Sequence, residues 1–311
     1  MKKRIILSFL IYFFSVVFII FVVPFLSDKL ANISLVHSST LYEVYHDTNT
    51  DNKSTDFSQT ETTNYGVTEY LDEGKEVETP FVQKIKTTKP LVSIVIDDYG
   101  YFVDNTVISS LSSDMPITVA IIPFQDHSKE IFSLAKKYDK EVIVHMPMEA
   151  LNHKLNVEPY ISSRMIDGEI IELLDKAFRE IDGVGLNNHM GSLATSDERV
   201  MNVVLKYLSS RGKIFLDSFT TVKSVASKVA KQKGLSILVR DVFIDNSSSE
   251  YYILSQLDKV ASVAYKKGYC VAIGHIKPNT INILLRWYQE NKENFNFVTL
   301  SQMEKSISQL Q

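Results

Sequence analysis

Two adjacent carboxylates, Asp97 and Asp98, stand at the end of a run of apolar, mostly β-branched residues, 92–96. Gly100 follows closely and permits a sharp turn at low steric cost. Neighbouring carboxylates repel each other unless a cation, a shared proton or solvent relieves the repulsion. A solvated turn is the plainest account of such a pair. At a strand end, the pair also has the chemistry to bind a metal ion and to move a proton.

Three histidines repeat this placement, because each one ends or follows its own strand-like run. They are His145 after 142–144, His189 after 184–188 and His275 after 271–274. In a parallel α/β sheet the carboxyl ends of the strands share one edge. We therefore expect the three imidazoles to converge with Asp97 and Asp98. Such a combination indicates a hydrolytic metal centre.

Zinc is the metal that commonly combines imidazole and carboxylate ligands, with bonds of about 2.0–2.2 Å. We predict that Asp98, His145 and His189 hold a divalent cation of this kind. A catalytic site of this type keeps one position open for water. Asp97 then remains as the base that accepts a proton from that water.

Two further residues complete the predicted catalytic set. His275 is expected to protonate a leaving group, and Arg240, at the end of another strand-like run, is expected to orient the carboxylate of Asp97. For Asp217, a helix N-cap and a partner of a metal ligand are both consistent with the sequence. Four acidic residues near strand ends have no assigned role: Glu149, Asp217, Asp241 and Asp245.

The elements that must position these residues alternate after residue 89. Strand-like runs are predicted at 91–96, 117–122, 141–146, 183–187, 213–217, 235–240, 269–274 and 296–299. Amphipathic helices are predicted near 104–112, 127–138, 167–181, 196–210, 221–233, 248–267 and 279–291. An alternation of this length favours an α/β fold, a distorted parallel (β/α) barrel with seven to eight strands, over an open doubly wound sheet.

Local signals mark several helix ends. Glycines fall where helices should stop before the next strand: Gly212, Gly234 and Gly268. A glycine there adopts the left-handed conformation at no steric cost. Capping boxes are predicted at two helix starts, Thr195 with Glu198 and Ser247 with Glu250.

The N-terminal part of the chain has a different character. Lys2, Lys3 and Arg4 precede an apolar stretch that runs to about Phe25, close to the ~20 residues that cross a bilayer as a helix. No small-residue cleavage pattern follows, so residues 1–26 are predicted as an uncleaved signal anchor, a transmembrane helix. The basic cluster favours a cytoplasmic N-terminus. The rest of the chain is then expected on the periplasmic side of the inner membrane.

Residues 27–88 are predicted to form a disordered, polar tether that leads to the folded part, 89–311. This segment holds 11 acidic residues and 5 lysines, a net charge of −6, with little apolar periodicity. The first 26 residues carry +3 and the whole chain −4, so the folded part is nearly neutral. It lacks the basic field that nucleic-acid binding requires. The single cysteine, Cys270, excludes an internal disulfide.

Six short motifs carry the candidate residues, in this order: Ile96-Asp97-Asp98-Tyr99-Gly100, His145-Met146-Pro147-Met148-Glu149, Asn188-His189-Met190-Gly191-Ser192, Phe215-Leu216-Asp217-Ser218, Arg240-Asp241-Val242-Phe243-Ile244-Asp245 and Ala272-Ile273-Gly274-His275. Together they resemble the divergent polysaccharide deacetylase family, within the carbohydrate esterase superfamily of distorted β/α barrels. The resemblance runs from about Pro90 to Met303. It covers neither the predicted anchor nor the tether.

The resemblance implies metal-dependent removal of acetyl groups from an N-acetylated sugar polymer. In the superfamily the first Asp of the pair is the base and the second binds metal, which matches Asp97 and Asp98. The superfamily usually has one His-x-x-x-His segment and an Arg-x-Pro-Tyr motif, and this chain has neither. By the resemblance, His145 and His189 must then come from different strands, with Arg240 as the replacement arginine. The predicted anchor suggests an envelope glycan such as peptidoglycan as substrate.

Two other functions are compatible with the same residues. The first is a non-catalytic barrel that binds a glycan or a partner protein in the envelope and retains a metal site. Pure binding does not require both Asp97 and His275. The second is a metal-free glycoside hydrolase, in which Asp97 works with another acid such as Glu149 across roughly 5–9.5 Å. That chemistry needs no cluster of imidazoles.

Overall fold

The computed structural model describes residues 89–309. The predicted anchor, 1–26, and the predicted tether, 27–88, lie outside these residues, so both stay predictions. Within residues 89–309, no helix combines the length and the apolar character that a membrane span requires.

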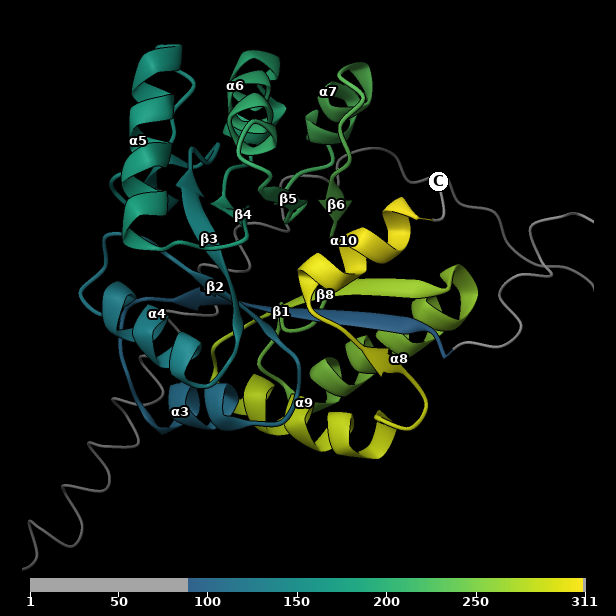
Figure 1. Cartoon of the computed structure of the whole chain (residues 1–311). Coiled ribbons are helices and arrows are strands. Elements are labelled where there is room, and N and C mark those ends of the chain that lie inside the picture. Colours follow the sequence, from purple (N-terminus) through teal and green to yellow (C-terminus); the bar gives the residue numbers. More distant parts are fainter. Residues whose placement is uncertain (1–88, 310–311) are drawn as a thin grey trace, which may run out of the picture. The chain divides into compact units, whose positions relative to one another are not determined.

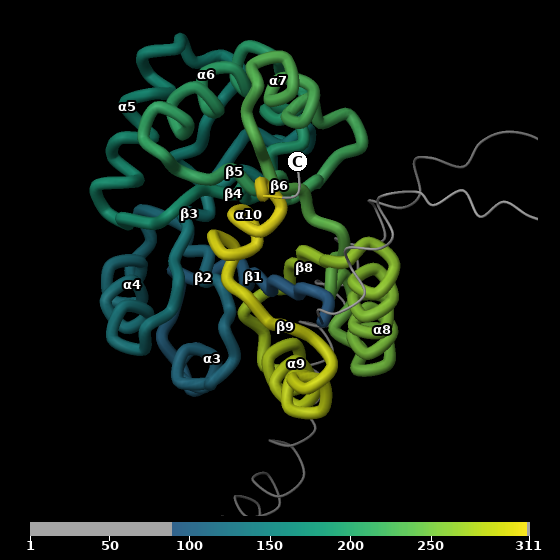
Figure 2. The backbone as a smooth tube through the Cα atoms, turned by 45° about the vertical axis from the view of Figure 1, so that its right-hand side comes forward, coloured from purple at the N-terminus to yellow at the C-terminus, as the bar shows by residue number. Residues whose placement is uncertain are grey.

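Parallel strands form one curled sheet, with the spatial order β6-β5-β4-β3-β2-β1-β8-β7 and with β9 paired to β1 (Figure 2). They are β1 (Leu91–Tyr99), β2 (Thr118–Ile121), β3 (Glu141–Met148), β4 (Gly185–Met190), β5 (Ile214–Asp217), β6 (Leu238–Val239), β7 (Val242–Phe243), β8 (Tyr269–His275) and β9 (Asn296–Phe297). Every predicted strand-like run contains one of them. Most strands are buried on both faces, which explains why they read as nearly continuous apolar runs.

The sheet is a half-barrel, so the predicted distorted barrel is right in its curl and wrong in its closure. β6 and β7 lie at opposite edges of the sheet, although only Arg240 and Asp241 separate them in the chain. The backbone N–H of Arg240 donates to Asp217 on one side (3.0 Å), and that of Asp241 donates to Val271 on the other (2.8 Å). Two residues therefore link the two edges of the curl, which sequence alone could not show.

Helices cover the outer face of the sheet: α3 (Asn105–Ser112), α4 (Ser128–Lys137), α5 (Asp167–Glu180), α6 (Glu198–Ser209), α7 (Ala226–Gln232), α8 (Glu250–Lys267) and α9 (Pro278–Asn291). Figure 1 shows α5, α6 and α7 along one part of the curl and α3, α8 and α9 along the opposite part. They pack against the outward-facing residues of the strands, such as Val92, Ile94 and Ile96. The predicted helices are all present, with shifted ends.

The predicted helix stops are confirmed and the predicted capping boxes are wrong. The three glycines have left-handed φ angles: Gly212 (61°), Gly234 (65°) and Gly268 (84°). Helix α6 starts instead after Asp197, whose carboxylate accepts a hydrogen bond from Val200 N. Thr195 lies in a preceding 3-10 turn, and α8 starts after Ser249. Asp197 stands directly before the first turn of α6, so its carboxylate, and not the hydroxyl of Thr195, accepts a hydrogen bond from a free N–H group of the helix.

A further helix that the sequence analysis missed, α10 (Leu300–Ser308), closes the inner face of the curl at the amino ends of the strands. In Figure 2 it lies at the centre of the ring of helices. Leu300 and Met303 are fully buried in a small inner core that also contains Val95 and Ile143. Glu141, the first residue of β3, accepts a hydrogen bond from Ser301 N (3.1 Å). This end of the half-barrel is therefore filled and closed.

On four strands the inner face changes from an apolar residue to a polar one two residues further along the chain. The pairs are Val95 with Asp97, Ile143 with His145, Leu216 with Ser218 and Ile273 with His275. Side chains alternate with a period of two along a strand, so both members of each pair face inward. The fold thus stacks a polar layer on an apolar one at the carboxyl ends of the strands.

We expect Leu300→Ala to lower the free energy of unfolding by about 2–5 kcal/mol, since it leaves a cavity in the inner core. Urea unfolding of the purified protein, followed by circular dichroism, measures this change. Lys305→Ala on the same helix is exposed and is the matched control, with an expected change within about 0.5 kcal/mol. Equal small effects for both variants would show that α10 does not contribute to the stability of the core.

Candidate metal centre

β1 ends in an irregularity that brings two consecutive carboxylates to one place. Neighbouring residues of a strand normally face opposite sides. The register between β1 and β2 shifts between Ile96 and Tyr99, and Asp98 has a φ of 67°, a left-handed conformation that is uncommon outside glycine. The carboxylate of Asp98 therefore joins Asp97. The predicted turn is confirmed at Gly100, where a Cβ would lie only 2.9 Å from the backbone oxygen of Ile122.

Asp98, His145 and His189 converge, from β1, β3 and β4 respectively. Asp98 Oδ1 lies 3.1 Å from His189 Nδ1 and 3.3 Å from His145 Nε2. The two nitrogens lie 3.2 Å apart. Ligand atoms with bonds of about 2.0–2.2 Å to a common cation lie roughly 3.0–3.5 Å from one another. The donor set and its spacing therefore fit a small divalent cation.

The electrostatics of the triad favour a cation as well. Burial alone would raise the pKa of Asp98, but hydrogen bonds to His145 and His189 outweigh burial and hold that pKa well below its ordinary value. Burial would lower the pKa of His145, but the negative charges of Asp97 and Asp98 raise it. Both shifts come from the attraction between these carboxylates and the imidazoles beside them. The carboxylates also concentrate negative charge in a largely buried site, which a bound cation would neutralise.

Asn187, which the sequence analysis passed over, connects a candidate ligand to the candidate base. Its side-chain oxygen lies 2.8 Å from His145 Nδ1, and its side-chain nitrogen donates to Asp97 Oδ1 (2.9 Å). A carboxylate accepts only, so the amide nitrogen must face Asp97 and the amide oxygen accepts the Nδ1–H of His145. This leaves His145 Nε2 free as a ligand atom. Asn187 lies opposite His145 in the β3–β4 register and two residues before His189, a spacing that could have revealed it.

Asp97 is 2% exposed, with Oδ2 3.5 Å from His145 Nε2. Burial raises its pKa, against the opposing effect of His145 and His275. A carboxylate with a raised pKa is a better proton acceptor than an exposed one. The amide of Asn187 orients it, a role that the sequence analysis predicted for Arg240.

Arg240 binds a loop instead of the predicted carboxylate. Its Nε donates to the backbone oxygen of Ser218 (2.7 Å) and its Nη2 to that of Phe219 (2.9 Å). No ion pair between Arg240 and Asp97 occurs within residues 89–309. The charge of Arg240 still acts on Asp97 and Asp217 through space. Its predicted catalytic role stays a prediction.

His275 completes the cluster and has a partner that the sequence left without a role. Its Nε2 lies 3.7 Å from Asp98 Oδ2, and its Nδ1 lies 2.8 Å from Asp245 Oδ1. Asp245 is fully buried and also accepts from Thr280 Oγ1 (2.7 Å). Burial would lower the pKa of His275, but Asp245 and Asp98 raise it. The Asp245–His275 pair is therefore arranged to hold and donate a proton.

The other three acidic residues hold loops. Glu149 accepts hydrogen bonds from Ser162 and Ser163, Asp217 from Phe219 and Ser224, and Asp241 from Lys267 and Val271. Asp217 is thus not a helix N-cap, because α7 starts after Val225. Glu149 is committed to its two serines, which disfavours its use in a glycoside hydrolase.

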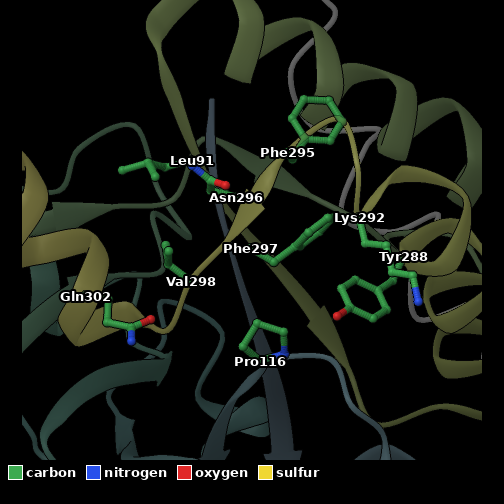
Figure 3. Close-up of a pocket in the computed structure, with 9 residues that line it drawn as sticks. All are labelled: Leu91, Pro116, Tyr288, Lys292, Phe295, Asn296, Phe297, Val298 and Gln302. Carbon is green, nitrogen blue, oxygen red and sulfur yellow. The ribbon is translucent and has the colours of Figure 1, made fainter. Parts of the chain in front are cut away.

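A pocket of about 500 Å³ lies away from this cluster. Figure 3 shows its lining, which includes Leu91 at the start of β1, Phe297 of β9 and Tyr288 of α9. Leu91 and Asp97 stand at opposite ends of β1. None of the candidate catalytic or ligand residues lines this pocket, so the candidate centre is the cluster at the carboxyl ends of the strands.

The fold and the cluster agree with the comparison to known families. Residues 94–303, about two thirds of the chain, match the divergent polysaccharide deacetylase family. The chain belongs to this family, which confirms the resemblance seen in its motifs.

Individual relatives support the same assignment. An uncharacterized protein of Haemophilus influenzae is 32% identical over 214 residues, which cover 68% of this chain and 76% of that protein. The uncharacterized protein YibQ of Escherichia coli is 33% identical over 196 residues, which cover 62% of this chain and 60% of that protein. The crystal structure of ATU2773 from Agrobacterium tumefaciens C58 shares the fold, with a TM-score of 0.65 at 20% identity over 70% of this chain and 89% of that one.

We expect Asn187→Ala to weaken the affinity for Zn²⁺ about 10–100-fold, since it removes the acceptor that fixes His145. Isothermal titration calorimetry of the protein stripped of metal measures the affinity. Asn187→Asp keeps an acceptor oxygen and should restore most of it, whereas Asp98→Ala should abolish binding. Asn282→Ala, at an exposed position of α9, is the control. Unchanged affinity in Asp98→Ala would contradict the ligand set.

Proposed function

We propose that this protein is a metal-dependent hydrolase that removes acetyl groups from an N-acetylated polysaccharide of the cell envelope, such as peptidoglycan. One observation carries the proposal. The Asp98–His145–His189 donor set lies between a buried carboxylate, Asp97, and a histidine with a carboxylate partner, His275. Family membership supports the same class of reaction. Zn²⁺ is the proposed metal, because the donor set is one carboxylate and two imidazoles.

The two groups beside the donor set divide the proton transfers between them. A cation held there would lower the pKa of water and polarise an acyl carbonyl. Asp97, whose pKa is raised by burial, accepts the proton from the attacking water. His275, whose pKa is raised by Asp245, donates a proton to the departing amine nitrogen. The amide bond breaks, and acetate and a free amino sugar are the products.

The cellular setting of the proposal comes from the sequence. The predicted anchor would hold the protein in the inner membrane, with its half-barrel on the periplasmic side. A substrate in the envelope would then be within reach of the tether. This location, the identity of the polymer and the membrane attachment are parts of the proposal.

A non-catalytic glycan-binding protein of the envelope is the second candidate. Two observations favour it. Within residues 89–309 no ion pair joins Arg240 to Asp97, and the chain lacks the superfamily's Arg-x-Pro-Tyr motif. Measuring both oligosaccharide binding and acetate release separates the two candidates. Metal-loaded protein that binds N-acetylated oligosaccharides and releases no acetate would have the second function.

We expect Asp97→Asn to lower kcat for acetate release from N-acetylated oligosaccharides by about 10²–10⁴-fold, because the amide cannot accept the proton. Elemental analysis should show that the variant retains its metal. Asp258→Asn, an exposed residue on α8, makes the same chemical change away from the site and should keep full activity. Undiminished release by Asp97→Asn would remove Asp97 as the base.

We expect Asp245→Asn to move the alkaline limb of the pH–rate profile to lower pH. Asp245 raises the pKa of His275, and the acid works only while it is protonated, so activity is lost as the pH rises through that raised pKa. Without the negative charge of Asp245, the pKa falls and the loss begins at lower pH. The kcat for acetate release, measured across the pH range, tests this. If the alkaline limb of the Asp245→Asn profile falls at the same pH as in the unmodified protein, another group is the acid.

A further inference from the structure

An aromatic ring stands exposed beside the candidate centre, on the loop that follows β5. Phe219 is 39% exposed. Its neighbour Ser218 has an Oγ that accepts from the side-chain nitrogen of Asn187 (3.2 Å), the same nitrogen that donates to Asp97. One amide group therefore separates the Phe219 loop from the candidate base. A single exposed apolar side chain is ordinary on a protein surface, so what distinguishes Phe219 is its place beside the candidate base and the way its backbone is held.

The backbone of Phe219 is held in a conformation that a non-glycine residue rarely adopts, with a φ of 50°. Groups on both sides fix it. Asp217 Oδ1 accepts from the N–H of Phe219 (2.8 Å), and Arg240 Nη2 donates to its carbonyl (2.9 Å). A carboxylate and an arginine, both largely removed from solvent, are thus used to hold an exposed phenylalanine in place. Strain that the surroundings maintain in this way is concentrated at functional sites.

A second exposed aromatic ring follows β1, three residues after Asp98. Tyr101 is 40% exposed. Only Tyr99, the last residue of β1, and Gly100, at the turn that follows, separate Tyr101 from Asp98 in the chain. Tyr101 and Phe219 extend from β1 and β5, which are separated in the curled sheet by β2, β3 and β4. The two residues therefore follow the carboxyl ends of different strands of the curl.

We propose that Phe219 and Tyr101 are stacking platforms that hold sugar rings of a polymer beside the acetyl group that is cleaved. A pyranose ring has a flat face of C–H bonds, which packs against the negative face of an aromatic ring. The folded part is nearly neutral, which suits an uncharged chain of N-acetylated sugars. Asp217 and Arg240 are then positioning residues for Phe219. This inference rests on the proposed function for the place of the cleaved acetyl group.

The probe is a set of N-acetylglucosamine oligomers of one to six units, tested with the full-length, zinc-loaded protein. Calorimetry gives the affinity, and acetate release gives KM and kcat. For the longer oligomers, Phe219→Leu should weaken binding and raise KM about tenfold, with kcat changed much less, because the stacking contact is lost. Tyr101→Leu should act in the same direction. Phe219→Tyr, which keeps a ring, should bind like the unmodified protein.

Matched controls separate stacking from general apolar exposure. Val222 lies on the same loop and is 87% exposed, and Tyr265 is an aromatic residue of α8 that is 61% exposed and packs near Phe295. Val222→Ala and Tyr265→Ala should leave binding and KM unchanged. Asp217→Ala should weaken oligomer binding by releasing Phe219, and Asp217→Asn, which keeps an acceptor, should restore part of it. Metal content and melting temperature confirm that each variant is folded and loaded.

The outcomes distinguish this inference from the proposed function. Oligomer binding that depends on Phe219 without any acetate release supports the platforms and refutes the deacetylase. Acetate release with the same KM in Phe219→Leu supports the deacetylase and refutes the platforms. A KM that does not improve as the oligomer lengthens from one to six units also refutes them.

Discussion

The structure depends on one electrostatic constraint, which is the placement of two consecutive carboxylates on the inner face of a buried strand. A regular strand would direct Asp97 and Asp98 to opposite faces. The irregular pairing of β1 and the left-handed backbone of Asp98 overcome this, at a cost of about 1–3 kcal/mol for such strain. The resulting repulsion is relieved by imidazoles from β3, β4 and β8. A cluster of this composition is stable with protons or with a cation at its centre, and the spacing of its atoms favours the cation.

The half-barrel gives this cluster its position by separating two layers on its inner face. The apolar layer, closed from below by α10, excludes solvent from the base of the site. The polar layer comes two residues later on β1, β3 and β8, so Asp97, His145 and His275 each follow an inward-facing apolar residue. Low exposure of Asp97 and Asp245 follows from this arrangement, and it raises the strength of every interaction between them and the histidines. The strength of these interactions therefore depends on how deeply the polar layer is buried as well as on which residues it contains.

The sequence allowed the prediction of most strands and of the residues that meet at their carboxyl ends. Strands carry a period of two and parallel sheets align their ends, so His145 and His189 could be brought together from different strands. Contacts that depend on tertiary geometry could not be predicted. The position of Asn187, two residues before His189, indicates its face of the strand, but its hydrogen bonds to His145 and Asp97 depend on the register of the sheet. Asp245 and His275 are 30 residues apart. Helix α10 does start with a capping box, Thr299 with Gln302, a local signal that the sequence analysis did not use. The strand predicted at 235–240 contains β6 alone, and β7, which was not predicted, pairs at the opposite edge of the sheet because the whole sheet curls.

The position of Arg240 shows how the parts of the site constrain one another. An arginine beside Asp97 would place a fixed positive charge within a few ångströms of the candidate cation, where like charges repel strongly in a buried site. The amide of Asn187 orients the same carboxylate without that charge. It also fixes His145 with its other end, which a guanidinium cannot do, because a guanidinium has no acceptor. Arg240 is thereby free to bind the carbonyls of Ser218 and Phe219. One neutral side chain thus orients both the candidate base and a candidate ligand, and the cationic one holds the loop that follows β5.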